Sequence, residues 1–206
     1  MSAKLCIIAC GNFGEEVRAA IAAEGWVDVV SAKLPAHCGR PPLTWEALRD
    51  SLPQDCTHVL VLGSACLGGL REAPTGLAPV RMMYLRRSCQ SLVAGSTLAA
   101  DAVADGGYLM TPAWLADWRV HMAKMGYGAA GSRDQLSDFV RRLVLFDTGT
   151  DPDANTRLEE MAAAVGLPAT RVEVGLDHTR LLLARCVREW RQENSTLTQF
   201  SAAEPD

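Results

Sequence analysis

Four cysteines stand at comparable places in the chain, each directly after an apolar segment that has the pattern of a buried strand. They are Cys10, Cys38, Cys66 and Cys89, separated by 28, 28 and 23 residues. This spacing approaches the length of one strand–helix–strand repeat, roughly 30 residues. Because the carboxyl ends of parallel strands meet at one edge of a sheet, where open α/β sheets bind ligands, we expect the four thiols to converge on a ligand site.

Four thiolates form a soft ligand set that suits zinc or an iron–sulfur cluster such as 4Fe–4S. Structural zinc sites usually take cysteines in closely spaced pairs, so four ligands from four separate segments favour a cluster held by the whole fold. His37, beside Cys38, is a candidate to replace a thiolate or to donate a hydrogen bond to sulfur. Gly11 is a further cofactor-site candidate, because it opens a turn whose amides suit a phosphate, although the third glycine of a dinucleotide fingerprint is missing.

Other interpretations of these residues stay open at this point. Cysteine is a small hydrophobic residue that is often simply buried. A thiol-dependent enzyme is a second possibility, with Cys89 activated at a helix N-terminus and His37 as its base. A four-cysteine zinc protein and an interaction module without metal are others. The sequence therefore does not decide whether the chain is an enzyme.

The remaining three of the seven cysteines have no predicted role in this site. Cys6 lies within an apolar strand and Cys186 within an apolar helix, so both are interpreted as core residues, and Cys56 receives no role. A disulfide framework is not expected, because the chain is interpreted as cytoplasmic and thiols there are kept reduced.

Composition excludes several function classes. The chain has 206 residues, enough for one sizeable core, and a formal net charge of −4 without a basic stripe, which argues against nucleic acid as a partner. The first apolar run is too short for a signal peptide, and no segment approaches the roughly 18 apolar residues of a membrane span. A cytoplasmic location follows, with no membrane partner and an oligomeric state that the sequence leaves open.

Alternating apolar runs and amphipathic segments predict an α/β fold with a doubly wound, mostly parallel sheet and helices on both faces. Two lobes with a seam near Gly106 are an option. The expected domain spans 1–192, and 193–206 is expected to be a flexible polar tail. Strands are expected at 4–10, 27–34, 57–64, 79–85, 143–146 and 170–174, and helices at 15–24, 44–52, 111–124, 132–142, 153–165 and 176–191.

Several short pieces occur in an order that is more specific than any one of them. They are Ile8-Ala9-Cys10-Gly11 followed by Glu15-Glu16, Cys38-Gly39-Arg40-Pro41, Leu62-Gly63-Ser64-Ala65-Cys66, Arg87-Ser88-Cys89, Tyr108-Leu109-Met110-Thr111-Pro112-Ala113-Trp114 and Asp147-Thr148-Gly149. In these pieces, between about Ile7 and Leu183, the chain resembles a bacterial and archaeal family catalogued as a domain of unknown function, number 1638.

The resemblance implies a metal centre and two possible settings. Family members occur beside corrinoid methyl-transfer systems, and a related branch is joined to sensor histidine kinases. The chain looks closer to that second branch, although Cys38 stands where other members carry histidine. The expectation is a module that binds an iron–sulfur cluster and serves in redox or ligand sensing, or as an accessory to corrinoid-dependent methyl transfer. Its partners would be a signalling kinase or corrinoid methyl-transfer proteins.

Overall fold

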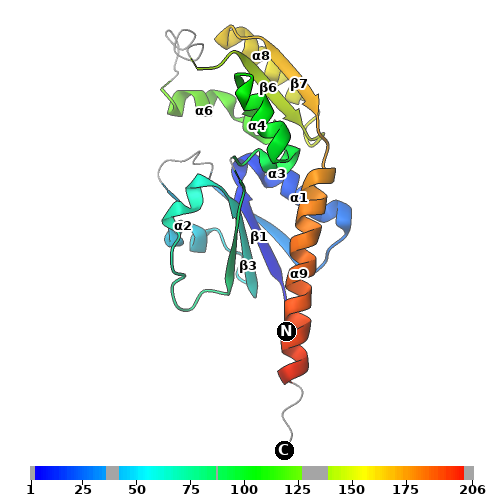
Figure 1. Cartoon of the computed structure of the whole chain (residues 1–206). Helices are drawn as coiled ribbons and strands as arrows, with labels where there is room; N and C mark the ends of the chain where they lie inside the picture. Colours follow the sequence, from blue (N-terminus) through cyan, green and yellow to red (C-terminus); the bar gives the residue numbers. More distant parts are fainter. Residues whose placement is uncertain (1–2, 36–41, 87, 127–138, 202–206) are drawn as a thin grey trace, which may run out of the picture.

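A computed structural model describes residues 3–35, 42–86, 88–126 and 139–201, with only the backbone described for 196–201. Its first sheet has four parallel strands in the order β2-β1-β3-β4 (Figure 1). The strands are β1 (Leu5–Cys10), β2 (Val29–Leu34), β3 (His58–Gly63) and β4 (Val80–Tyr84). β1 and β3 are almost entirely buried, as expected of central strands in a parallel sheet.

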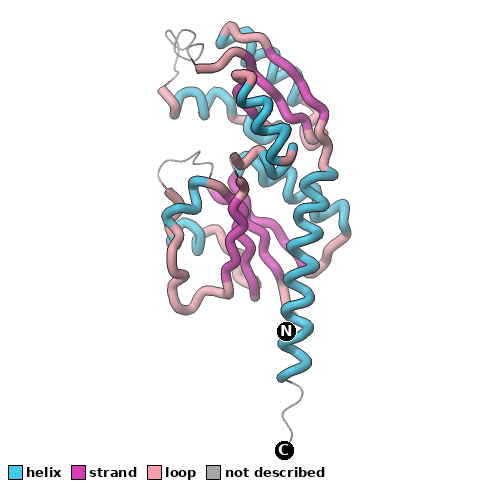
Figure 2. The backbone as a smooth tube through the Cα atoms, in the orientation of Figure 1, coloured by secondary structure: helices cyan, strands magenta, loops and turns pink. Residues whose placement is uncertain are grey.

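A second sheet of three parallel strands lies apart from the first, in the order β5-β6-β7 (Figure 2). Its strands are β5 (Gly107–Met110), β6 (Arg142–Asp147) and β7 (Ala169–Glu173). The predicted α/β class with parallel strands is therefore confirmed. The strands form two sheets. The chain passes from the first sheet to the second between β4 and β5, and the predicted seam near Gly106 lies directly before β5.

Helices connect the strands within each sheet and between the sheets. They are η1 (Gly11–Phe13), α1 (Gly14–Glu24), α2 (Trp45–Asp50), η2 (Ala65–Gly69), α3 (Ser91–Ala94), α4 (Ser96–Ala104), α5 (Pro112–Ala116), α6 (Trp118–Lys124), α8 (Ala154–Val165) and α9 (Asp177–Ser201). In the described part of the chain, no helix has the length and apolar character needed to cross a membrane.

The two sheets share part of their core, which fixes how they face each other. One apolar cluster contains Ile7 of β1, Phe13 of η1 and Phe146 of β6, all at most 5% exposed. α9 follows β7 of the second sheet and packs against α1 of the first, where Arg180 donates a 2.8 Å hydrogen bond to Glu24. The two sheets are thus joined by a shared core and by the contact of α9 with α1.

Three predicted element boundaries were wrong. The helix expected at 111–124 is divided into α5 and α6 by Asp117, whose φ of −114° and ψ of 22° are not helical. Arg142, expected to end a helix, instead begins β6; most of that expected helix, 132–138, lies outside the described residues. The polar segment expected to be a loose tail continues α9 as far as Ser201.

Polar side chains in the extension of α9 bond to the backbone of the preceding turn. The side chain of Asn194 donates a hydrogen bond to the carbonyl oxygen of Trp190 at 2.9 Å, and the hydroxyl of Ser195 donates one to the carbonyl oxygen of Arg191 at 2.8 Å. Both bonds span the four residues of one helical turn, so these polar side chains are accommodated within the helix.

Candidate functional site

The first sheet has a topological switch point between β1 and β3. From these two neighbouring strands the chain proceeds outward in opposite directions, to β2 on one side and to β4 on the other. Crevices at such points, outside the carboxyl ends of the strands, are the usual ligand sites of open α/β sheets. Cys10 is the last residue of β1, and Cys66 lies in η2, directly after β3.

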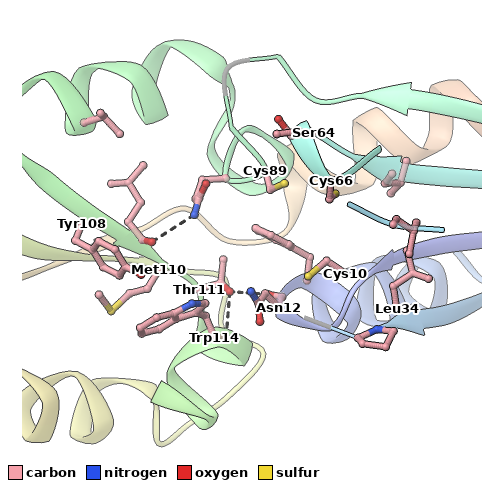
Figure 3. Close-up of a pocket in the computed structure, with 18 of the residues that line it drawn as sticks. Cys10, Asn12, Leu34, Ser64, Cys66, Cys89, Tyr108, Met110, Thr111 and Trp114 are labelled. Carbon is pink, nitrogen blue, oxygen red and sulfur yellow. Dashed lines mark hydrogen bonds between the residues drawn. The ribbon is translucent and has the colours of Figure 1, made fainter. Parts of the chain in front are cut away.

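A cavity of about 430 Å³ opens at this switch point. The first sheet and the segments that follow its strands supply one wall, which includes Cys10, Leu34, Leu62, Ser64, Cys66 and Cys89. Figure 3 shows the sulfur atoms of the three cysteines on this same side of the pocket. The prediction that cysteines after successive strands converge at the sheet edge is thus met by the three that the structure describes.

Cys66 and Cys89 interact directly. A hydrogen bond from the Cys89 thiol lowers the pKa of Cys66 to about 6, helped by the backbone of Ser64, Cys66 and Leu67 and opposed by burial. Gly63 leaves the room for this geometry, because a Cβ there would lie 3.1 Å from the Cys66 sulfur and 2.7 Å from Leu67. At neutral pH Cys66 is therefore a thiolate, the form that binds metals and attacks electrophiles.

The opposite wall of the cavity comes from the second sheet and its helices. Its apolar residues are Val103, Tyr108, Leu109, Met110 and Trp114. The rings of Tyr108 and Trp114 meet edge to face with centroids 5.5 Å apart, and His121 stacks on Trp114 at 5.0 Å. These contacts hold the aromatic side chains in place, so the second wall is a preformed surface.

Two hydrogen bonds join the walls. The hydroxyl of Thr111 donates to the carbonyl oxygen of Asn12 at 2.7 Å, and the side chain of Gln90 donates to the carbonyl oxygen of Leu109 at 3.3 Å. The same Thr111 oxygen accepts from the amide of Trp114 at 3.4 Å and so caps the N-terminus of α5. Thr111 is 1% exposed, so both bonds are shielded from water.

Replacing Thr111 with valine tests this junction. The variant keeps the shape of the side chain but removes the donor to Asn12 and the helix cap, and it leaves a buried carbonyl oxygen without that bond. We expect a loss of about 1 to 3 kcal/mol in the free energy of unfolding, measured by urea denaturation. A stability unchanged within error would show that the two walls are not held together at this point.

A buried carboxyl group forms a second connection between the two halves. Glu16 of α1 is 0% exposed and accepts a 3.3 Å hydrogen bond from the hydroxyl of Thr148, in the loop after β6. Its other oxygen, Oε2, has no hydrogen-bond partner. Burial raises the pKa of Glu16 to about 7, opposed by hydrogen bonds from the backbone and Thr148.

The loop that contacts Glu16 is itself held by polar contacts. Asp147 accepts a 2.8 Å hydrogen bond from the amide of Gly149 and a 2.6 Å hydrogen bond from Arg171 of β7. The Thr148 and Thr150 hydroxyls lie 2.9 Å apart. The loop is therefore a fixed support for the Glu16 contact.

The other predicted site residues either do not line the cavity or lie outside the described residues. Cys38 and His37 lie outside the described residues. Gly11 lies in η1 but is not among the residues that line the cavity, where its neighbours Cys10 and Asn12 are. Within the described ranges, no three His, Cys, Asp or Glu side chains are close enough to hold a metal ion. These ranges thus supply one thiol pair and a third thiol on the same wall.

The predicted activation of Cys89 by a helix is not supported. Gln90 is the N-cap of α3, a helix of only four residues, so Cys89 precedes a segment with little dipole. The pKa of Cys66 is lowered, because its neighbour Cys89 stabilises the Cys66 thiolate by a hydrogen bond. Sequence spacing placed the two cysteines near one another but did not predict this hydrogen bond.

Two of the remaining cysteines were interpreted incompletely. Cys6 and Cys56 form a disulfide with their Cα atoms 5.7 Å apart, whereas the sequence predicted no disulfide and no role for Cys56. The sheet brings the two segments together, because Cys6 lies in β1, which pairs with β3, and Cys56 lies in the segment just before β3. Cys186 is 5% exposed in the core, as predicted, and burial raises its pKa to about 11.

The residues of the second wall were not predicted to belong to the site. Trp114 was expected only within a helix, at 111–124; it is 5% exposed, as a core residue would be, yet it also borders the cavity. The segment 108–114 and the pair Glu15-Glu16 were both noted as shared pieces of a family resemblance. That resemblance was the available signal, since no periodicity distinguishes a core tryptophan from one at a pocket wall.

The comparisons with known proteins identify a family. No curated protein matches the chain. A family model described as "Protein of unknown function (DUF1638)" matches residues 46–183, more than half of the chain and including Cys66, Cys89 and the whole second wall. The chain therefore belongs to the DUF1638 family.

Proposed function

We propose that the protein binds a metal centre, an iron–sulfur cluster, through Cys10, Cys66 and Cys89, with Cys38 as the fourth ligand that the sequence spacing predicts. The observation that carries this proposal is that three thiols, from three separate strand ends, line one wall of a cavity at the switch point, with Cys66 and Cys89 in direct hydrogen-bond contact. Cys10 would have to move toward this pair when the centre binds, because the three thiols are not within metal-binding distance of one another in the described structure. A four-cysteine zinc centre would use the same donors, because both centres bind soft thiolate ligands.

The electrostatics of the pair support metal binding. A metal binds cysteine as thiolate, so a thiol that is already ionised at neutral pH gives up no proton on binding. Cys66 meets this condition with a pKa of about 6. When bound, an iron–sulfur cluster would supply one-electron redox chemistry, and the chain would supply its ligands and a largely apolar enclosure.

The biological role within this proposal follows the family resemblance. It is a sensory or accessory module in redox sensing, ligand sensing or corrinoid-dependent methyl transfer, with a signalling kinase or corrinoid methyl-transfer proteins as partners. Nucleic acid and membranes are not among the proposed partners, since the chain is mildly acidic and has no basic stripe.

Protection against alkylation tests the ligand set. The protein is reconstituted without oxygen with iron and sulfide, or in parallel with zinc, then treated with iodoacetamide and analysed by mass spectrometry. We expect modification of Cys10, Cys66 and Cys89 to slow by at least about tenfold when the metal is bound, with buried Cys186 serving as an unreactive control. Equal modification of all three with and without metal would contradict the assignment.

A thiol-dependent enzyme is the second candidate, and the ionised Cys66 is the observation that favours it. In metal-free protein at pH 7, Cys66 should be about nine-tenths thiolate and should react faster than every other cysteine. The rate should fall as the pH drops through 6. If another cysteine reacts faster than Cys66, or if the reaction rate of Cys66 shows no inflection near pH 6, Cys66 is not the activated nucleophile that this candidate function requires.

A further inference from the structure

The cavity is larger than the proposed metal centre requires. Its volume of about 430 Å³ falls in the range of roughly 300 to 1,000 Å³ typical of pockets for small organic ligands. The three thiols occupy the wall of the first sheet, and the facing wall carries no cysteine. Figure 3 shows Tyr108, Met110 and Trp114 across the pocket from Cys10 and Cys66. A metal centre at the thiols would leave the aromatic half of the cavity for another molecule.

The residues that line the cavity disfavour binding of a charged ligand. None of the lining residues in the described ranges is Asp, Glu, Lys, Arg or His. A charged ligand would therefore lose its hydration without an ion-pair partner on the described walls, which is costly in an apolar pocket. The polar groups Thr111 and Gln90 already donate hydrogen bonds within the protein.

The aromatic wall selects for a flat apolar group. Trp114 is 5% exposed, and its ring contacts the ring of Tyr108 edge to face at 5.5 Å and stacks with the ring of His121 at 5.0 Å. Because these rings are fixed before binding, a ligand ring that packs on them orders little additional structure. Offset and edge-to-face ring contacts of this kind add stabilisation beyond the burial of apolar area.

We propose that the pocket binds a neutral small molecule with an aromatic ring, which packs against Tyr108 and Trp114 while its other end faces the thiol wall. This inference deepens the proposed function, because ligand and metal centre share one cavity, and it names the class of molecule that a sensory module would detect. The ligand site itself is formed by the second wall and does not require the metal to be present.

Three isosteric probes test the charge selection: neutral 1-naphthalenemethanol, anionic 1-naphthoate and cationic 1-naphthylmethylammonium. Their affinities are measured by isothermal titration calorimetry with both metal-free and reconstituted protein. The neutral probe should bind at least about tenfold more tightly than either charged one, which corresponds to about 1.4 kcal/mol. Tighter binding of a charged probe, or no binding of the neutral probe by either form at millimolar concentration, would overturn the proposal.

A matched pair of variants locates the site. Val103 lines the cavity from α4 and is 54% exposed, so Val103→Trp should fold normally and fill the apolar side. Val120 of α6 is 51% exposed and lies outside the cavity lining. We expect Val103→Trp to weaken binding of 1-naphthalenemethanol at least tenfold and Val120→Trp to leave it unchanged. Equal affinities of the two variants, with native thermal midpoints, would place the probe elsewhere.

Metal content measured on the same samples separates the two proposals. Val103→Trp should retain the metal load of the unmodified protein, because Val103 is on a different element from all three thiols. A protein that binds the neutral probe but no metal would refute the metal centre and leave the ligand site standing. A protein that binds metal but not the neutral probe would refute the ligand site and leave the metal centre standing.

Discussion

Replacing Cys66 with serine is expected to reduce the bound metal of the anaerobically reconstituted protein by at least about tenfold. The serine hydroxyl is not ionised at neutral pH, whereas the Cys66 thiol is held as thiolate by its hydrogen bond from Cys89. Cys10→Ser and Cys89→Ser should have the same effect, because each thiol lines the same wall. Metal content is measured by elemental analysis of each purified variant.

Cys186→Ser is the matched control for these variants. Cys186 is buried in α9, outside the cavity lining, and its pKa is raised to about 11 by burial. Its replacement should affect stability without lowering the metal load of the folded protein. A full metal load in two of the three pocket variants, with normal circular dichroism, would remove those thiols from the ligand set.

The stability of the protein should fall between pH 4.5 and 8 because of Glu16, and Glu16→Gln should remove that fall. The folded state holds the proton of Glu16 up to a pH of about 7, whereas the unfolded chain releases it near the usual value of 4.5. Since the folded state binds more protons in this window, its stability declines as the pH rises. A shift of this size corresponds to about 3 kcal/mol.

The measurement is the free energy of unfolding by urea at a series of pH values for both proteins. Glutamine preserves the acceptor for Thr148 but carries no ionisable proton. The free energy of unfolding of Glu16→Gln, relative to that of the unmodified protein, should therefore increase by about 3 kcal/mol from pH 4 to 8. A difference that does not vary with pH would show that Glu16 titrates as an ordinary surface carboxyl.

Glu15 is the control for this experiment, because it is adjacent to Glu16 in α1 but its pKa is shifted in the opposite direction. Hydrogen bonds from Lys33 and Arg18 lower the pKa of Glu15. Its contribution to stability is therefore present above its unfolded pKa and lost as the pH falls. Glu15→Gln should reduce the stability at neutral pH and flatten the acid side of the profile, without the change expected between pH 4.5 and 7 for Glu16.

The first sheet was predictable because its signal is local. The buried strands β1 and β3 are continuous apolar runs; β1 ends on a cysteine, and β3 is followed within a few residues by one. Parallel connection then determines that the residues after these strands meet at one edge. Cys10, Cys66 and Cys89 were therefore placed in one region by spacing alone.

The second wall and the junction between the sheets were not predictable in the same way. Nothing in the sequence around Trp114 or Thr111 indicates that they face the first sheet, since their contacts with Tyr108 and Asn12 depend on how two separate sheets pack. The ionisation of Cys66 likewise depends on one hydrogen bond across 23 residues of sequence. Such pairings arise only when the fold has brought distant segments together.

The most direct test of the metal centre is the metal and sulfide content of the protein purified without oxygen, recorded with its visible absorption spectrum. We expect a brown protein with near-equal amounts of iron and acid-labile sulfide. Zinc in a colourless protein would keep the thiol ligands but replace the cluster. The absence of iron, zinc, nickel and cobalt, even after anaerobic reconstitution, would contradict the metal centre and leave the Cys66–Cys89 pair to thiol chemistry.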